Sequence, residues 1–277
     1  MIYRKSLLQR EVEIAASFLR RAFGISEKHK ILKVVVLGTG FGDKLILENE
    51  KRIPFEDVPG FSHLDEIEGH NRCFCHGFLD GKEVLTVARI HMNESSFNSK
   101  VPKMIRMLTE ICIELGMRKY FVTAAVGSLN EDIHVGDLVT VNSFLSLFAP
   151  DMTMTFPGEF SNPEDVISKR LIGLAEALEE HYGRKIKTGV HVMLRGPWFE
   201  GRKVDKIVLW NNGADVVGMS IYPEVGIVSL HGGIEVLPIC FVTNSISDEM
   251  NHEAHQREAK KMAGNLGAYM RELIKMS

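Results

Sequence analysis

The feature that most constrains the fold of this chain is an apolar, β-branched run that ends in glycines, residues 31–42 (ILKVVVLGTGFG). Such a run predicts a buried strand followed by a tight loop. The same format recurs at residues 119–130 (KYFVTAAVGSLN), and residues 234–247 (IEVLPICFVTNSIS) form another apolar run that ends in polar residues. Ligands in α/β sheets bind beyond the carboxyl ends of strands, so we expect these loops to form one site.

Helical patterns separate the strands along the chain. The predicted helices, set by apolar spacing and by terminal glycines, cover residues 5–23, 101–116, 164–182, 201–212, 223–233 and 251–275. Asp80-Gly81 between two strand patterns indicates a hairpin, and Asn162 before Pro163 is a candidate helix cap. The alternation predicts an α/β fold in a single domain over residues 1–277, with terminal helices in 1–24 and 251–275.

The charge balance excludes several classes of partner. The chain has 33 basic and 36 acidic residues and a net charge of −3, so no basic excess attracts nucleic acid or an anionic membrane. Glu11 and Glu13 interrupt the first apolar stretch, which is therefore not a signal peptide. We expect a cytoplasmic protein without a membrane span. The four cysteines have no zinc-site or CxxC spacing and are expected to be reduced and buried.

Two segments have the chemistry of an anion site. Residues 38–42 (GTGFG) combine close backbone approach with the Thr39 hydroxyl, although they match neither a Walker loop nor a dinucleotide fingerprint. Arg89 and His91 follow a strand and share one face, which suits a phosphate dianion, and His70 is a possible third donor. Each segment alone also fits an ordinary turn or a solvated edge strand.

Four further loops have residues suited to a heterocycle. Ala125 lies in a small-residue loop, and Phe199 beside Glu200 can stack on a ring and accept its N–H. Met219 with Ser220, and Asn244 after the last strand, add a flexible apolar group, a hydroxyl and an amide that both donates and accepts. Each loop alone has an equally good structural explanation.

The segment NHEAH invites a zinc interpretation. HExxH places its histidines four residues apart, whereas His252 and His255 are three apart, so we expect a surface cluster at a helix start and no metal site.

Taken together and in this order, the segments VVVLGTGFG, ARIHM, GPWFE, GADVVGMSIYPEV and FVTN resemble the trimeric purine nucleoside phosphorylases over residues 31–275. The resemblance implies a single α/β domain with a mixed, distorted central sheet, and a homotrimer with active sites near the subunit interfaces. It implies phosphate-dependent cleavage of purine nucleosides such as inosine and guanosine, with phosphate as co-substrate and no metal or organic cofactor.

The resemblance also assigns roles to individual residues. Phosphate would bind Thr39, His70, Arg89, His91, the backbone of Ala125, and Ser220. The base would bind Phe199, Glu200 and Asn244, with Met219 under the sugar, Asn93 at the ribose side and His252 near the 5′-hydroxyl. Asn244, Glu200 and His91 would be the catalytic groups. Asn244 indicates 6-oxopurines, because related 5′-methylthioadenosine phosphorylases have aspartate there.

The sequence departs from the family pattern on the sugar side. Asn93 replaces a tyrosine that helps to enclose the ribose, and TAAVGSLN replaces TNAAGGLN, which places Val126 near the base pocket. The loop at 149–163 is short, and the aromatic that reaches a neighbouring subunit would be Phe148, Phe156 or Phe160. The alternatives are therefore a phosphorylase for 5′-modified nucleosides, such as methylthio derivatives, a catalytically impaired nucleoside-binding homologue, and, from GTGFG alone, a dinucleotide-dependent oxidoreductase.

Overall fold

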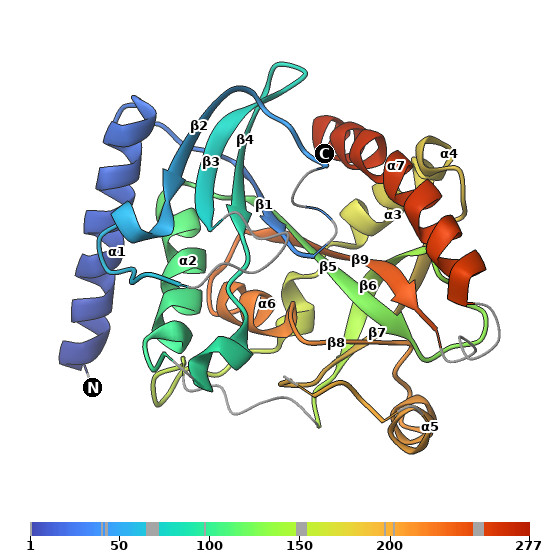
Figure 1. Ribbon diagram of the computed structural model, residues 1–277. Helices are drawn as coiled ribbons and strands as arrows, with labels where there is room; N and C mark the ends of the chain where they lie inside the picture. The colour runs from blue at the N-terminus through green and yellow to red at the C-terminus, as the bar shows by residue number, and fades with distance from the viewer. Residues whose placement is uncertain are drawn as a thin grey trace.

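A nine-stranded mixed sheet forms the centre of the protein (Figure 1). The computed structural model describes residues 2–39, 41, 44–64, 72–96, 98–147, 154–196, 198–201, 203–245 and 252–277. The strands are β1 (Lys33–Leu37), β2 (Glu48–Pro54), β3 (Cys73–Leu79), β4 (Lys82–Ala88), β5 (Lys119–Ser128), β6 (Leu138–Leu145), β7 (Lys187–Met193), β8 (Val216–Gly218) and β9 (Glu235–Asn244). The helices are α1 (Ile2–Phe23), α2 (Val101–Glu114), α3 (Lys169–Ala177), α4 (Glu179–Tyr182), α5 (Val204–Asn211), α6 (Tyr222–Val228) and α7 (His252–Met276), with 3-10 turns η1 (Phe55–Asp57), η2 (Met92–Ser96) and η3 (Pro163–Val166).

The strand order, β2-β3-β4-β1-β5-β8-β7-β6-β9, contains a closed portion because β9 pairs with β5 as well as with β6. Strands β4, β1, β5 and β9 are mutually parallel, and β6, β7 and β8 run against them. The carboxyl ends of β4, β1, β5 and β9 therefore lie at one edge. The antiparallel strand β8 pairs with β5 only at the last two residues of β5, with Val217 beside Gly127. The carboxyl end of β8 therefore joins the same edge.

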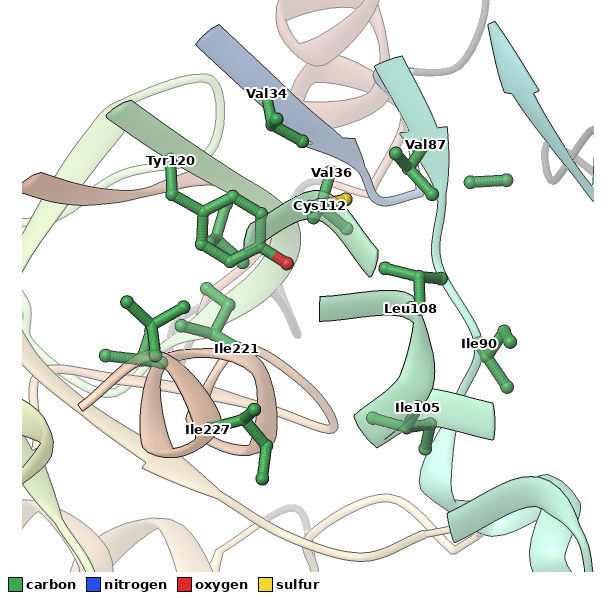
Figure 2. Packing of buried hydrophobic residues seen from close by; sticks show 14 of the residues in the cluster. Val34, Val36, Val87, Ile90, Ile105, Leu108, Cys112, Tyr120, Ile221 and Ile227 are labelled. Atoms are coloured by element: carbon green, nitrogen blue, oxygen red, sulfur yellow. The ribbon is translucent and has the colours of Figure 1, made fainter. Parts of the chain in front are cut away.

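Alternating side chains of the buried strands supply two cores on opposite faces of the sheet. Val34 and Val36 of β1 pack with α1, α2 and α6, whereas Val35 and Leu37 pack with α3, α4 and α7. Figure 2 shows the first core, where Tyr120 of β5 and residues of α2 and α6 meet the sheet. In Figure 1, α1 and α2 lie on one side of the sheet and α3 and α7 on the other. The mixed, distorted sheet implied by the family resemblance is thus confirmed.

Most predicted elements are present, and the hairpin has the expected turn. Asp80 and Gly81 both have positive φ, 47° and 73°, as a two-residue turn between β3 and β4 requires. Helix α2 ends before Gly116, whose φ is 107°. The predicted helices 5–23 and 251–275 correspond to α1 and α7.

One expectation about local structure was wrong, and one strand was not foreseen. The single helix predicted over 164–182 is three short helices, because Ser168 caps a new start at α3 and Leu178 leaves helical geometry before α4. Asn162 does cap, but it caps η3, through the Glu164 N–H. Strand β2, with the polar sequence ENEKRIP, was not expected, since an exposed edge strand has no apolar alternation.

The part of the chain that the structure describes contains no helix long and apolar enough to cross a membrane. Within the same part, no three histidine, cysteine or acidic side chains gather as metal ligands. All four cysteines are free and buried.

Candidate active site

A cleft of about 540 Å³ opens at the carboxyl edge of the sheet. Its described lining comes from the ends of β1, β4, β5, β7, β8 and β9 and from the loop after β7. The lining residues are Thr39, Arg89, His91, Asn93, Ala125, Val126, Gly127, Leu194, Phe199, Glu200, Val217, Gly218, Met219, Ser220, Thr243 and Asn244. Segments far apart in sequence thus contribute to one cavity, as expected if the loops beyond the carboxyl ends of the strands form one site.

Arg89 is the buried charge of this cleft, with 1% of its surface exposed. Its Nε donates to Glu224 Oε1 at 2.6 Å, and its Nη1 donates to the Thr123 carbonyl at 2.5 Å. Nη2 is buried and makes no hydrogen bond within the described residues. Because a buried donor without a partner is costly, this atom is suited to an anion that enters the cleft.

Gly38 leaves the space that Arg89 occupies. A Cβ at this position would lie 2.3 Å from the Thr123 carbonyl oxygen and 2.6 Å from Arg89 Nη1. The Gly38 N–H donates to Thr123 Oγ1, whose hydroxyl donates to the Val36 carbonyl. The first glycine of GTGFG therefore serves close packing of the arginine, and it leaves Thr39 at the cleft surface.

His91 and Asn93 enter the cleft from the segment around η2. The Glu94 carboxylate accepts the backbone N–H of His91 at 2.7 Å and also binds Arg72 at 2.8 Å. Arg72 donates in addition to the Arg89 carbonyl. These contacts fix the chain between Arg89 and Asn93.

Met219 and Ser220 follow β8 at a strained turn. Ile221 has φ 75° and ψ −56°, a conformation that is rare for a β-branched residue, and its side chain is fully buried in the core. The core holds this backbone in place, and the turn presents Ser220, 7% exposed, to the cleft.

Asn244 lies at the end of β9 beside β5. Thr243 Oγ1 is 3.2 Å from Asn244 Oδ1 and donates to the Val126 carbonyl at 3.3 Å. The carboxamide rests against Gly127, where a Cβ would be 2.9 Å from Nδ2. Its amide group faces a cavity that includes Phe199 and Glu200, of which Phe199 is 82% exposed.

The structure brings together all but two of the residues that the sequence singled out. Those that line the cleft are Thr39, Arg89, His91, Asn93, Ala125, Phe199, Glu200, Met219, Ser220 and Asn244. His70 lies outside the described residues, and so does the side chain of His252, the first residue of α7. Of the three candidate aromatics for a neighbouring subunit's site, Phe148 also lies outside the described residues. Phe156 packs on the core under Arg106, and Phe160 is 91% exposed.

Two further residues at the site were not foreseen. Leu194 lines the cleft, and Glu224 pairs with Arg89 from α6. A signal for Glu224 was available, since a carboxylate within the apolar run PEVGIV needs a buried partner.

His191 of β7 was also missed, because a histidine in a strand pattern is ambiguous. Its ring is fully buried, packs edge-on against Phe144, and has no hydrogen-bond partner on either nitrogen among the described residues. Burial, and then the positive charge of Arg89, lower the pKa of His191 to about 3. The ring is therefore neutral at ordinary pH. It lies directly behind the cleft, since a Cβ on Gly218 would be 3.0 Å from Nε2.

The fold and the cleft define an α/β protein whose small-molecule site combines a buried arginine with an aromatic, a carboxylate and an amide. The chain belongs to the phosphorylase superfamily, whose family model matches residues 33–275. It is 28% identical to purine nucleoside phosphorylase 1 of Geobacillus stearothermophilus over 278 residues, 95% of this chain and 96% of the relative. It is 30% identical to mouse purine nucleoside phosphorylase over 224 residues, 76% of this chain and 75% of the relative.

Solved structures of purine nucleoside phosphorylases also match this chain. Isoform 2 of purine nucleoside phosphorylase from Schistosoma mansoni, in complex with cytosine and ribose-1-phosphate, matches with a TM-score of 0.78 and 25% identity, covering 96% of this chain and 95% of that chain. A Schistosoma mansoni purine nucleoside phosphorylase in complex with inosine matches with a TM-score of 0.76 and 25% identity, over 97% of this chain and 96% of that one.

Proposed function

We propose that this protein is a purine nucleoside phosphorylase. It cleaves 6-oxopurine nucleosides such as inosine and guanosine with inorganic phosphate, giving the free base and ribose 1-phosphate. The observation that carries the proposal is the meeting, in one cleft, of a buried arginine with a free N–H group and of an amide beside a carboxylate. The names of the relatives and the inosine complex of one solved relative support it.

The phosphate site consists of Thr39, Arg89, His91, the backbone of Ala125, and Ser220, with His70 as a further donor. Arg89 supplies a fixed positive charge and the unpartnered Nη2. Buried charge acts strongly because water does not screen it. The serine and threonine hydroxyls complete the hydrogen bonds of the dianion.

The base site consists of Phe199, Glu200 and Asn244. Phe199 stacks on the purine, Glu200 accepts the N1–H group, and Asn244 binds N7 and O6. A 6-oxopurine fits this set because its O6 accepts and its N1 carries a proton. Met219 lies under the sugar, Asn93 lies at the ribose side, and His252 serves the 5′-hydroxyl.

The reaction breaks the bond between C1′ and the purine nitrogen while a phosphate oxygen forms a bond to C1′. Negative charge gathers on the leaving purine, and positive charge develops on the ribose ring. Hydrogen bonds donated by the Asn244 amide strengthen as the purine becomes an anion, which lowers the barrier selectively, while Glu200 accepts the N1–H group and holds the base in place. Phosphate held by Arg89 lies close to C1′ and attacks it. These steps call for phosphate as co-substrate and for no other cofactor.

The active assembly is a homotrimer in which a neighbouring subunit covers the open side of the cleft. Phe199, which lines the cleft, and its chain neighbour Trp198 are 82% and 84% exposed, and a neighbouring subunit would cover them. Of the two candidate aromatics that the structure describes, Phe160 is the one free to reach a neighbouring copy, since it is 91% exposed while Phe156 is held by its own core.

A substrate panel tests the proposal. Inosine, guanosine, adenosine and methylthioadenosine are incubated with and without phosphate, and the released base is separated by chromatography. We expect phosphate-dependent release of hypoxanthine and guanine. Exclusive cleavage of methylthioadenosine would instead show a phosphorylase for 5′-modified 6-aminopurine nucleosides, and no release from any nucleoside would contradict the proposal.

A further inference from the structure

Glu224 is the only described acidic side chain in hydrogen-bond contact with the Arg89 guanidinium, and it is itself 4% exposed. It lies in the first turn of α6 and is absent from the described lining of the cleft. One of its oxygens receives Arg89 Nε at 2.6 Å, and the other is buried without a hydrogen bond in the described part of the chain. A buried ion pair of this kind adds little to stability, so its presence calls for a reason.

The surroundings of Arg89 supply that reason. Glu224 accepts a hydrogen bond from Nε of the guanidinium, and the Thr123 carbonyl accepts one from Nη1. The backbone of Gly38 packs against Nη1. The guanidinium is planar, so fixing two of its nitrogens also fixes the direction of the third. Nη2, which makes no hydrogen bond within the described residues, is the nitrogen left for a ligand.

Glu224 also links two segments of the cleft. It follows Ser220 by four residues, across the strained turn at Ile221, whereas Arg89 follows β4 on the other side of β1 and β5. The ion pair therefore sets the position of the arginine relative to the Ser220 hydroxyl. Both groups belong to the phosphate site proposed above.

We propose that Glu224 is a positioning residue for phosphate, acting through Arg89 and without touching the substrate. The inference rests on the proposed function, since it assumes that Arg89 binds phosphate. The carboxylate lowers the net positive charge near the anion, so its benefit is one of orientation. Removal of the acceptor oxygen and removal of the negative charge of Glu224 are therefore expected to have different effects on phosphate binding.

The test compares Glu224→Ala with Glu224→Gln by measuring the dissociation constant of inorganic phosphate calorimetrically and the KM values for phosphate and inosine. In E224A the Nε contact is lost and the guanidinium can swing. We expect weaker phosphate binding by about tenfold or more, with little change in the KM for inosine. In E224Q the amide oxygen still accepts from Nε, so phosphate binding is expected to stay within a few-fold of the wild type.

Glu110→Ala is the matched control. Glu110 binds buried Arg106 at 3.1 Å in an ion pair away from the cleft, so its loss is expected to lower the melting temperature and leave phosphate affinity unchanged. If E224A does not fold, Glu224→Asp replaces it: the shorter carboxylate draws the guanidinium back, and weaker phosphate binding is again expected.

The outcomes are separable. Phosphate binding in E224A and E224D equal to that of the wild type would overturn the positioning role. Tighter binding in both E224A and E224Q would overturn it too, because the carboxylate would then act only by cancelling charge. A wild-type protein that binds no phosphate would contradict the proposed function itself.

Discussion

Gly127 of β5 leaves the space in which the Asn244 carboxamide sits: a Cβ on residue 127 would lie 2.9 Å from Nδ2 and 3.3 Å from Oδ1. The two residues are also register partners of the parallel strands β5 and β9. The position of the amide proposed to bind the purine is thus set by a missing side chain on the neighbouring strand.

We predict that Gly127→Ala displaces Asn244 and impairs base recognition. Since the added methyl group enters below contact distance of the amide, kcat/KM for inosine is expected to fall by about ten- to a hundredfold, with phosphate affinity unchanged. Gly173→Ala, on α3 where nothing lies within 4 Å of the new Cβ, is the control and is expected to be fully active. Normal inosine kinetics in G127A would contradict this account of Asn244.

Asn244→Asp tests the preference for 6-oxopurines. An ionised aspartate accepts but does not donate, so it repels O6 and suits the 6-amino group of adenosine. We expect kcat/KM for inosine to fall by about a hundredfold or more and the ratio of adenosine to inosine turnover to rise. Steady-state kinetics with both nucleosides measure this. The exposed Asn212→Asp controls for the added charge, and an unchanged substrate ratio in N244D would remove Asn244 from base recognition.

Phe160→Ala tests the role of the neighbouring subunit. The ring is 91% exposed in the single chain, so its loss is expected to leave the stability of the subunit unchanged. If it covers the cleft of a second copy, the KM for inosine rises several-fold. Phe156→Ala is the opposite case, because its ring lies 4.7 Å from the Arg106 guanidinium carbon, and we expect about 3 kcal/mol lower stability. Unaltered inosine kinetics in F160A would exclude Phe160 as the covering aromatic.

His191 is expected to make the protein sensitive to acid. Its pKa of about 3 in the folded state lies below the ordinary value of 6.5, so between these pH values the unfolded chain binds a proton that the folded chain does not. The free energy of unfolding is therefore undiminished above pH 6.5. It falls as the pH is lowered, by up to about 1.4 kcal/mol per pH unit.

Urea unfolding at pH 7, 6 and 5 measures this effect in His191→Gln. The variant is less stable at neutral pH but is expected to lose about 2 kcal/mol less than the wild type between pH 6.5 and 5. His181→Gln, on the exposed surface of α4, is the matched control for the loss of a histidine. Equal slopes in H191Q and the wild type would contradict the lowered pKa of His191 in the folded protein.

The strands and their order of appearance could be predicted because burial on both faces leaves an apolar signature, as in residues 33–37 and 235–242. The polar edge strand β2 has no such signature. The second pairing of β9 with β5, which closes part of the sheet, depends on strands more than a hundred residues apart. The break at Leu178 falls within residues 174–180, all of them good helix formers, and α4 beyond the break packs on α7.

The residues that face the cleft could be predicted in large part because they carry polar groups just after apolar strands. The contacts of those behind the cleft could not be predicted. Glu224 and His191 lie inside a helix and a strand, and their proximity to Arg89 and Gly218 arises only from the fold. Ile221 gives no hint of positive φ, since the surrounding core imposes this conformation.

The most direct test of the central claim is the fate of the sugar when inosine is cleaved. The protein is incubated with inosine and one equivalent of inorganic phosphate, and the products are followed by phosphorus NMR together with hypoxanthine release. We predict that hypoxanthine and ribose 1-phosphate appear in equal amounts and that neither forms without phosphate. Hypoxanthine with free ribose, at a rate independent of phosphate, would contradict a phosphorylase and the phosphate site assigned to Arg89.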